Sequence, residues 1–135
     1  MAKVVHISEA ASLAIHSMAM VAGSNEILNV TRIAELTHSS RNHLAKVMQT
    51  LVKNNLLDST RGPKGGFVIK GDPSQITLLQ IYEMFEGTLE HHYCGIEEEK
   101  CPFKSCVFGN LANKFSFEFS EYLKNTTLSA LIKTT

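Results

Sequence analysis

Hydrophobic residues recur at helical spacing between Ser8 and Gly23. The residues that form this pattern are Ala11, Ala14, Ile15, Met18 and Ala22. Such a period predicts an amphipathic helix. Gly23, followed by Ser24 and Asn25, is typical of a helix end.

Two further helical segments follow, with a polar break at residues 37–40. Thr31 is a candidate cap for the first, which carries Ile33, Ala34 and Leu36. The second has apolar residues at i, i+3, i+4 and i+7, namely Leu44, Val47, Met48 and Leu51. Its outward positions are hydrogen-bond donors without an acidic residue: Arg41, Asn42, His43, Lys46, Gln49, Thr50 and Lys53. Nothing on that predicted face would repel phosphate.

Residues 58–70 contain two short extended runs around a glycine-rich turn, which predicts a β-hairpin. A helix, a turn, a longer helix and a basic hairpin, in this order, are the layout of a winged helix-turn-helix. Arg61 and Lys64 lie at the predicted tip, where an arginine can enter a narrow minor groove and a lysine can contact a phosphate. The alternative is that the glycines are simple turn residues.

The C-terminal half begins with a predicted helix over residues 76–86, capped by Thr77 and ended by Gly87. A polar loop over 88–106 precedes a helix of up to about 20 residues. This last helix is marked by Phe108, Leu111, Phe115, Phe119 and Tyr122. Its aromatic surface needs a covering partner, and we expect a second copy of the chain. The alternative is that it packs back on its own domain.

The chain has 135 residues, of which 44% are hydrophobic and 19% charged, as expected for one folded domain. The fold class is predicted as mainly α with a small β-hairpin. We divide it into a winged helix-turn-helix at 1–86, a cysteine-bearing loop at 87–107, and a dimerisation helix with a C-terminal turn at 108–135. The longest uncharged stretch, residues 10–25, is too short and polar to span a membrane, and no signal-peptide pattern is present. We therefore expect a cytoplasmic protein.

The net charge is zero, but the charges are segregated along the chain. Residues 38–70 carry six basic and one acidic side chains, whereas residues 71–100 carry one basic and seven acidic ones. Screening confines such fields to about 8–10 Å, so a local basic patch can hold a polyanion on a neutral molecule. A solvated charged face without a partner is the alternative.

All three cysteines lie in the same loop with the spacing Cys94-x6-Cys101-x4-Cys106. An odd count in a reducing compartment argues against a disulfide framework. Soft thiolates suit zinc or an iron–sulfur cluster, and redox-active free thiols are the alternative. Candidates for a fourth ligand are His91, His92 and residues 97–99 nearby, and Glu9 at a distance. Each of these could also be an ordinary solvated side chain.

Four strings together resemble the IscR/NsrR family of iron–sulfur winged-helix transcription regulators over nearly the whole chain. They are Ser-Arg-Asn-His-Leu-Ala-Lys-Val at 40–47, Arg-Gly-Pro-Lys-Gly-Gly-Phe at 61–67, Ile-Thr-Leu at 76–78 and Asn-Thr-Thr-Leu-Ser-Ala-Leu at 125–131. The clustered cysteines add to the resemblance. The Ser-Arg-Asn-His start is most similar to the NsrR branch, which responds to nitric oxide.

This resemblance implies a homodimer clasped through long C-terminal helices, a pseudo-palindromic operator in double-stranded DNA, and one cluster per subunit, 4Fe–4S in preference to 2Fe–2S. The NsrR branch takes a carboxylate from the start of the first helix of the other subunit, and Glu9 aligns with it. The IscR branch uses a histidine three residues after the last cysteine, where this chain has Gly109. Two departures are that Glu9 is longer than the usual aspartate and that the cysteine spacing is less even.

The leading hypothesis is a transcription repressor that senses nitric oxide, redox or iron status through its cluster, with Cys94, Cys101, Cys106 and Glu9 as ligands. The expected DNA contacts are Ser40, Arg41, Asn42, His43, Lys46, Lys53, Arg61 and Lys64. The alternatives are a zinc- or thiol-dependent DNA-binding regulator, a regulator controlled by a protein partner, and an interaction module with a vestigial wing. No nucleophile–base pair, phosphate loop or paired-carboxylate signature points to an enzyme.

Overall fold

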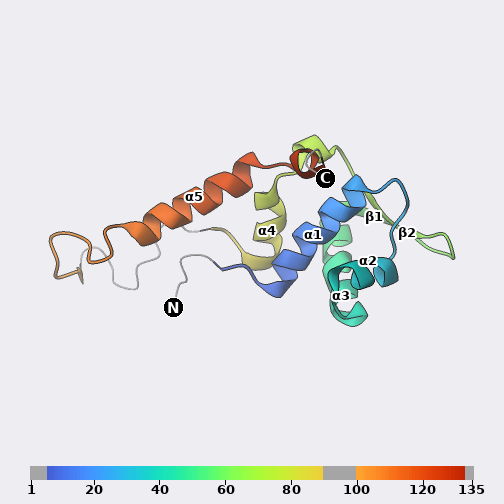
Figure 1. The fold of residues 1–135 in the computed structure, drawn as a ribbon, viewed down its shortest axis with the longest axis horizontal. Helices are drawn as coiled ribbons and strands as arrows, with labels where there is room; N and C mark the ends of the chain where they lie inside the picture. The colour runs from blue at the N-terminus through green and yellow to red at the C-terminus, as the bar shows by residue number, and fades with distance from the viewer. Residues whose placement is uncertain (1–5, 90–99, 133–135) are drawn as a thin grey trace.

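The computed structural model describes residues 6–89 and 100–132. Its elements, in chain order, are α1 (Glu9–Gly23), α2 (Val30–Thr37), α3 (Arg41–Lys53), β1 (Leu57–Thr60), β2 (Gly66–Ile69), the 3-10 turn η1 (Pro73–Gln75), α4 (Leu78–Glu86), α5 (Leu111–Asn125) and α6 (Leu128–Ile132). Figure 1 shows α5 projecting from a body formed by the other elements. The predicted class, mainly helical with a two-stranded hairpin, is confirmed.

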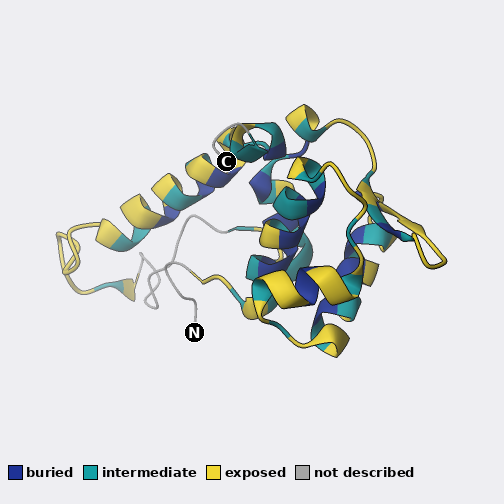
Figure 2. Cartoon of the chain, turned by 45° about the vertical axis from the view of Figure 1, so that its right-hand side comes forward, coloured by how far each residue is buried: buried dark blue, intermediate teal, exposed yellow. Residues whose placement is uncertain are grey.

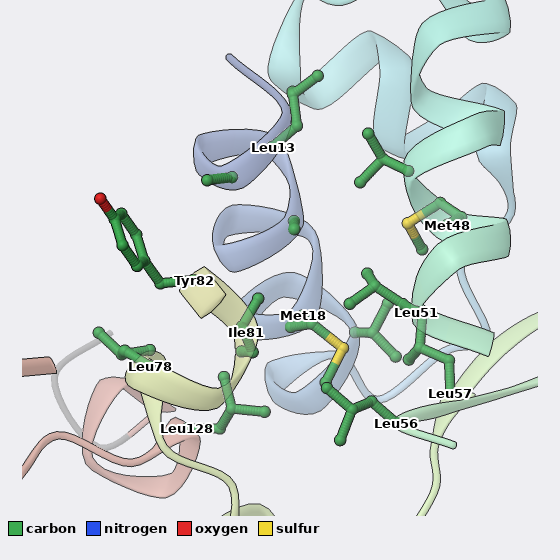
Figure 3. Close-up of a cluster of buried hydrophobic side chains, with 14 of the residues drawn as sticks. Leu13, Met18, Met48, Leu51, Leu56, Leu57, Leu78, Ile81, Tyr82 and Leu128 are labelled. Atoms are coloured by element: carbon green, nitrogen blue, oxygen red, sulfur yellow. The ribbon is translucent and has the colours of Figure 1, made fainter. Parts of the chain in front are cut away.

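The core of the body lies around α1. Met18 of α1, Leu51 of α3, Ile81 of α4 and Leu128 of α6 are all fully buried. Figure 3 shows these side chains gathered around Met18, together with Leu56 and others from neighbouring segments. Each fully buried aliphatic side chain contributes roughly 1.5–3 kcal/mol. The core therefore fixes α3 and the hairpin relative to α1.

Side-chain caps define where the first three helices begin. Ser8 Oγ accepts a hydrogen bond from the backbone N–H of Ala11 at 3.1 Å. The cap of α2 is Asn29, whose Oδ1 accepts from the backbone N–H of Arg32 at 2.8 Å. The prediction that Thr31 caps this helix is wrong, because α2 begins at Val30 and Thr31 already lies in its first turn.

The hairpin pairs β1 with β2 in antiparallel register, with Leu57 opposite Ile69 and Thr60 opposite Gly66. The segment between α1 and α2 extends this pairing, since the backbone N–H of Phe67 donates to the oxygen of Leu28 at 2.9 Å. This bridge attaches the hairpin to the helical body. It connects residues far apart in sequence and was not part of the sequence prediction.

The chain end returns to the body after α5. The backbone N–H of Leu78 donates to Thr126 O, and that of Leu128 donates to Ile76 O, both at 3.0 Å. The predicted cap Thr77 is confirmed, with Gln80 completing a capping box. The C-terminal turn predicted after Asn125 is α6, and it packs on α1.

The length of α5 lies within the predicted limit of about 20 residues, but the helix begins later than expected. It has 15 residues and begins after Asn110, which takes a left-handed conformation, so Phe108 lies before the helix. Ser116, Ser120 and Leu123 form its buried side, while large apolar residues are exposed elsewhere along it. Figure 2 shows this exposed side of α5. In the parts of the chain that the structure describes, no helix is long and apolar enough to cross a membrane.

Candidate nucleic-acid interface

The amino-terminal end and one side of α3 carry exposed donors. Ser40 caps the helix, its Oγ accepting from the backbone N–H of His43 at 3.0 Å. Arg41 and Asn42 occupy the first turn and are exposed, as are Lys46 and Lys53. The first turn holds no acidic side chain, so the positive end of the helix dipole is open to an anion.

The exposed side of α3 follows from its sequence period. Asn42, Lys46, Gln49 and Lys53 are spaced i, i+4, i+7 and i+11 and are all exposed. The opposite side is buried in the core and consists of Leu44, Val47, Met48 and Leu51. Burial of the apolar side thus orients the polar side outward, where it can enter a DNA groove.

His43 is separated from this exposed set. Its residue is half-buried, and its Nε2 is shielded from solvent without a hydrogen-bond partner among the described residues. Buried polar atoms usually have a partner, so this nitrogen is an exception. The structure therefore places the His43 ring toward the protein, apart from Arg41 and Asn42.

A shallow concavity of about 640 Å³ lies beside the first turn of α3. It is lined by Val30, Ser40, Arg41, Asn42 and Ala45. Val30 and Ala45 are two contributors that the sequence reasoning missed. Val30 is the first residue of α2 and Ala45 lies within α3, so no local pattern in the sequence brings the two together.

The tip of the hairpin holds Arg61 and Lys64 exposed to solvent. The backbone N–H of Gly65 donates to Gly62 O at 2.9 Å and closes the turn that contains Pro63. A Cβ on Gly65 would lie 2.1 Å from Thr60 O, so this turn requires glycine. Within the described residues neither Arg61 nor Lys64 forms a salt bridge, whereas Lys70 at the hairpin base lies 3.9 Å from Asp58. Both tip cations are thus available to phosphate.

The described part of the cysteine loop that precedes α5, residues 100–107, lies at the far end of this helix (Figure 1). Cys101 is half-buried and Cys106 is exposed. Cys94, His91, His92 and residues 97–99 lie outside the described residues. Glu9 is exposed in the first turn of α1, and no three metal-binding side chains come together among the described residues. The thiolate donors suit iron, but within the described residues Glu9 does not join Cys101 and Cys106 in a three-ligand group.

The family model named Rrf2, described as an iron-dependent transcriptional regulator, matches residues 7–134. The chain belongs to the Rrf2 family. An Rrf2 protein is a DNA-binding transcription regulator and not an enzyme.

Individual relatives are also transcription regulators, but their names point to different branches of the family. The chain is 29% identical to the regulator NsrR of Oceanobacillus iheyensis over 80% of its own length and 75% of that protein. It is 27% identical to the regulator IscR of Sodalis glossinidius over 76% of its length and 62% of the relative. These comparisons establish the Rrf2 family without selecting a branch.

Solved structures share the Rrf2 fold. CymR, the global cysteine regulator of B. subtilis, superposes with a TM-score of 0.80 and 23% identity, covering 97% of this chain and 98% of that one. The T. potens IscR superposes with a TM-score of 0.68 and 23% identity, covering 96% and 88%. At this identity the likeness supports the winged helix-turn-helix architecture alone.

Proposed function

We propose that this Rrf2 protein is a repressor that binds a pseudo-palindromic operator as a homodimer, and that an iron–sulfur cluster in the cysteine loop sets its operator affinity. The observation that carries the DNA-binding part is the exposed donor side of α3 beside a hairpin with two unpaired cations at its tip. The signal is nitric oxide, redox or iron status, and the Ser-Arg-Asn-His start of α3, which resembles the NsrR branch, favours nitric oxide.

Each group of DNA contacts has a distinct role in this proposal. Arg41 and Asn42, at the start of α3, reach base edges, since arginine and asparagine pair with guanine and adenine. Lys46, Lys53 and Lys64 contact phosphates, and Ser40 holds the start of the helix toward the backbone. Arg61 enters the minor groove. His43 contacts DNA through a neighbouring phosphate if its ring turns outward on binding.

The homodimer is proposed to form through the exposed apolar side of α5 and the residues before it. These residues are Phe103, Val107, Phe108, Leu111, Phe115, Phe117 and Tyr122, each at least 48% exposed in the single chain. So many exposed large apolar side chains within 20 residues are typical of a protein interface. Pairing of two copies would place two α3 helices for half-sites separated by one DNA turn, about 34–36 Å.

The chain's three proposed parts then have separate tasks. Residues 1–86 read DNA, residues 87–107 hold the cluster, and residues 108–135 form the dimer, with α6 also packed on the body. Cys94, Cys101 and Cys106 would hold a 4Fe–4S cluster together with Glu9 of the second copy. When bound, this cluster supplies reactivity toward nitric oxide and oxidants. The exposure of Glu9 leaves its carboxylate open to a second copy, which supports donation across the dimer.

DNA recognition is tested with a duplex selected from a random library by the parent protein. Arg61→Ala is expected to weaken binding by roughly tenfold and to lower the salt slope by about one, as loss of one cationic contact predicts. Lys124→Ala is the matched control, because Lys124 is an exposed cation in the last turn of α5 and is not among the proposed DNA contacts. Equal affinities and salt slopes for the two variants would contradict the proposed wing contact.

The cluster is tested by anaerobic reconstitution with ferrous iron and sulfide, followed by absorption spectra and iron and sulfide analysis. Glu9→Ala is expected to lose its visible absorption at least tenfold faster than the parent in air, because an open iron site is exposed to oxidants. Glu26→Ala, which removes another exposed glutamate, is the control. Identical decay of all three proteins would remove Glu9 from the ligand set.

A zinc- or thiol-dependent regulator is the second candidate. The exposure of Cys106, whose thiol is open to metal ions and oxidants, favours it. About one zinc per subunit, without visible absorption, would identify this candidate. A colourless, metal-free protein whose operator affinity changes with a protein partner would identify the partner-controlled form.

A further inference from the structure

Tyr82 lies where three segments distant in sequence meet. It belongs to α4, is 3% exposed, and its hydroxyl donates to the backbone oxygen of His6 at 2.5 Å. Its ring meets that of Phe119 on α5 edge-on, with centroids 5.4 Å apart and planes at 82°. Figure 3 shows the Tyr82 ring directed away from the Met18 cluster. One side chain therefore joins the start of the chain to the projecting helix.

The contact to His6 holds the segment that leads into α1. A buried tyrosine hydroxyl needs a hydrogen-bond partner, and here the partner is the main chain two residues before the cap Ser8. Glu86, one turn further along α4, lies with Oε2 3.6 Å from His6 Nε2. Two side chains of α4 thus hold this segment, and Glu9 follows it directly.

The contact to Phe119 connects the same residue to α5. Phe119 is half-buried and is the aromatic residue of α5 that meets Tyr82 within the described chain, while Phe115 and Phe117 are exposed. Beyond this point α5 leads back to the loop that carries Cys101 and Cys106 (Figure 1). A displacement of α5 would therefore act directly on the Tyr82 ring through Phe119.

We infer that Tyr82 is a positioning residue that couples α5 to the start of α1, so that a change at the cysteine loop alters the DNA-reading unit. The inference rests on the proposed function for its regulatory meaning. The connection continues to α3, because α1 and α3 share the buried core around Met18 and Leu51. Rigid packing of this kind passes on a displacement when both ends have two arrangements.

The mechanical connection is tested on metal-free protein by amide hydrogen exchange. The amides of Ala11 and Ser12 bond to Oγ and O of Ser8 at 3.1 and 3.0 Å, and they report the order of the start of α1. Tyr82→Phe keeps the ring and removes the hydroxyl, and it should speed exchange at these amides about fivefold, the effect of one typical hydrogen bond. Unchanged exchange would overturn the inference.

Gln80→Ala is the matched control on the same helix. Gln80 Oε1 accepts from the backbone N–H of Thr77 at 2.8 Å, so the variant also loses one hydrogen bond of α4 but touches neither His6 nor α5. It should match Tyr82→Phe in thermal stability and leave exchange at Ala11 and Ser12 as in the parent. Equal acceleration in both variants would mean general loosening of α4 and would also overturn the inference.

The regulatory part is measured as the ratio of duplex affinities between cluster-loaded and metal-free protein. Tyr82→Phe and Phe119→Leu should each bring this ratio about fivefold closer to one, with metal-free affinity within about twofold of the parent. Gln80→Ala should keep the parent ratio. A parent-like ratio in Tyr82→Phe overturns the inference and leaves the proposed function standing. If the parent protein bound the duplex equally well with and without the cluster, the proposed function would be contradicted. The hydrogen-exchange experiment would then still show whether Tyr82 holds the start of α1.

Discussion

At the scale of single residues, Gly66 shows how close the hairpin approaches the body. A Cβ on Gly66 would lie 2.4 Å from the backbone oxygen of Leu28, the atom that accepts the hydrogen bond from Phe67. Real Cβ atoms do not approach a main-chain oxygen so closely, so the two segments would have to separate. The hairpin is therefore attached through a position that only glycine fits.

We expect Gly66→Ala to lower the free energy of unfolding by about 1–3 kcal/mol, as overpacking usually does. Gly23→Ala is the control, because the nearest atom to its added Cβ is Ile132 Cγ1 at an ordinary 3.8 Å, and alanine favours the helix. Urea denaturation of both variants measures the difference. If Gly66→Ala were as stable as Gly23→Ala, the close approach of Leu28 to β2 would be wrong.

Asp72 provides a pH-dependent contribution at the turn η1. The hydrogen bond that its Oδ1 accepts from the backbone N–H of Ser74, at 2.9 Å, lowers the pKa of the Asp72 carboxyl below its ordinary value. A carboxyl with a lowered folded-state pKa stabilises the fold above its unfolded pKa of about 4, and this stabilisation is lost as the pH falls through the folded pKa.

Asp72→Asn keeps a side-chain acceptor but has no carboxyl to titrate. We expect the parent to lose more stability than Asp72→Asn when the pH falls from about 5 to 3. The measurement is the urea midpoint of both proteins across this range. Parallel curves would show that the Ser74 hydrogen bond does not favour the charged form.

At the scale of elements, Ser40 has two separable effects on α3. Its hydroxyl caps the helix, and its position at the positive helix end faces the proposed phosphate contact. Aspartate caps a helix as well as serine does, but its charge repels phosphate. The two effects can therefore be measured with two variants at one position.

Ser40→Ala should lower the free energy of unfolding by about 1 kcal/mol, whereas Ser40→Asp should retain the parent stability. Operator affinity should fall about tenfold or more in Ser40→Asp, because a negative charge meets a phosphate. Thermal unfolding and mobility-shift titrations provide the two readouts. A stable Ser40→Asp protein that binds DNA like the parent would place the start of α3 away from the DNA.

At the scale of the whole molecule, α5 is the element whose exposed apolar side lacks a partner within the described chain. Phe115 is 49% exposed near the middle of that side, while Ser116 and Ser120 face the body. These small side chains allow α5 to pack closely on α4. The large aromatic rings that stay exposed can then contact a second protein surface. The proposed second surface is α5 of another copy.

We expect Phe115→Glu to convert the parent dimer to a monomer in light scattering coupled to gel filtration, because it places a charge in an apolar interface. Operator affinity should fall at least about a hundredfold, since two linked half-sites are read as one. Gln80→Glu adds the same charge at an exposed capping-box position and should leave the dimer intact. A folded Phe115→Glu protein that remained dimeric would move the interface elsewhere.

Local patterns were sufficient to predict α1, α3, α4 and the hairpin. The spacing of Leu44, Val47, Met48 and Leu51 predicted the buried side of α3, and this is the side that the core covers. Helical period, side-chain caps and glycine turns act within a few residues, so they can be read directly along the chain. The exposure of Arg41, Asn42 and Lys46 follows from the same period, while their contacts with DNA stay a prediction.

Contacts between distant segments were decided by the tertiary structure alone. The pairing of Leu28 with Phe67 and the hydrogen bond from Tyr82 to His6 each join segments with no shared local pattern. The helical period placed His43 among the outward residues of α3, whereas its Nε2 is buried. The cap of α2 is Asn29 instead of the predicted Thr31, because the helix begins at Val30, before Thr31. A one-dimensional period identifies which side of an element is apolar, but only the assembled core determines which neighbour covers it.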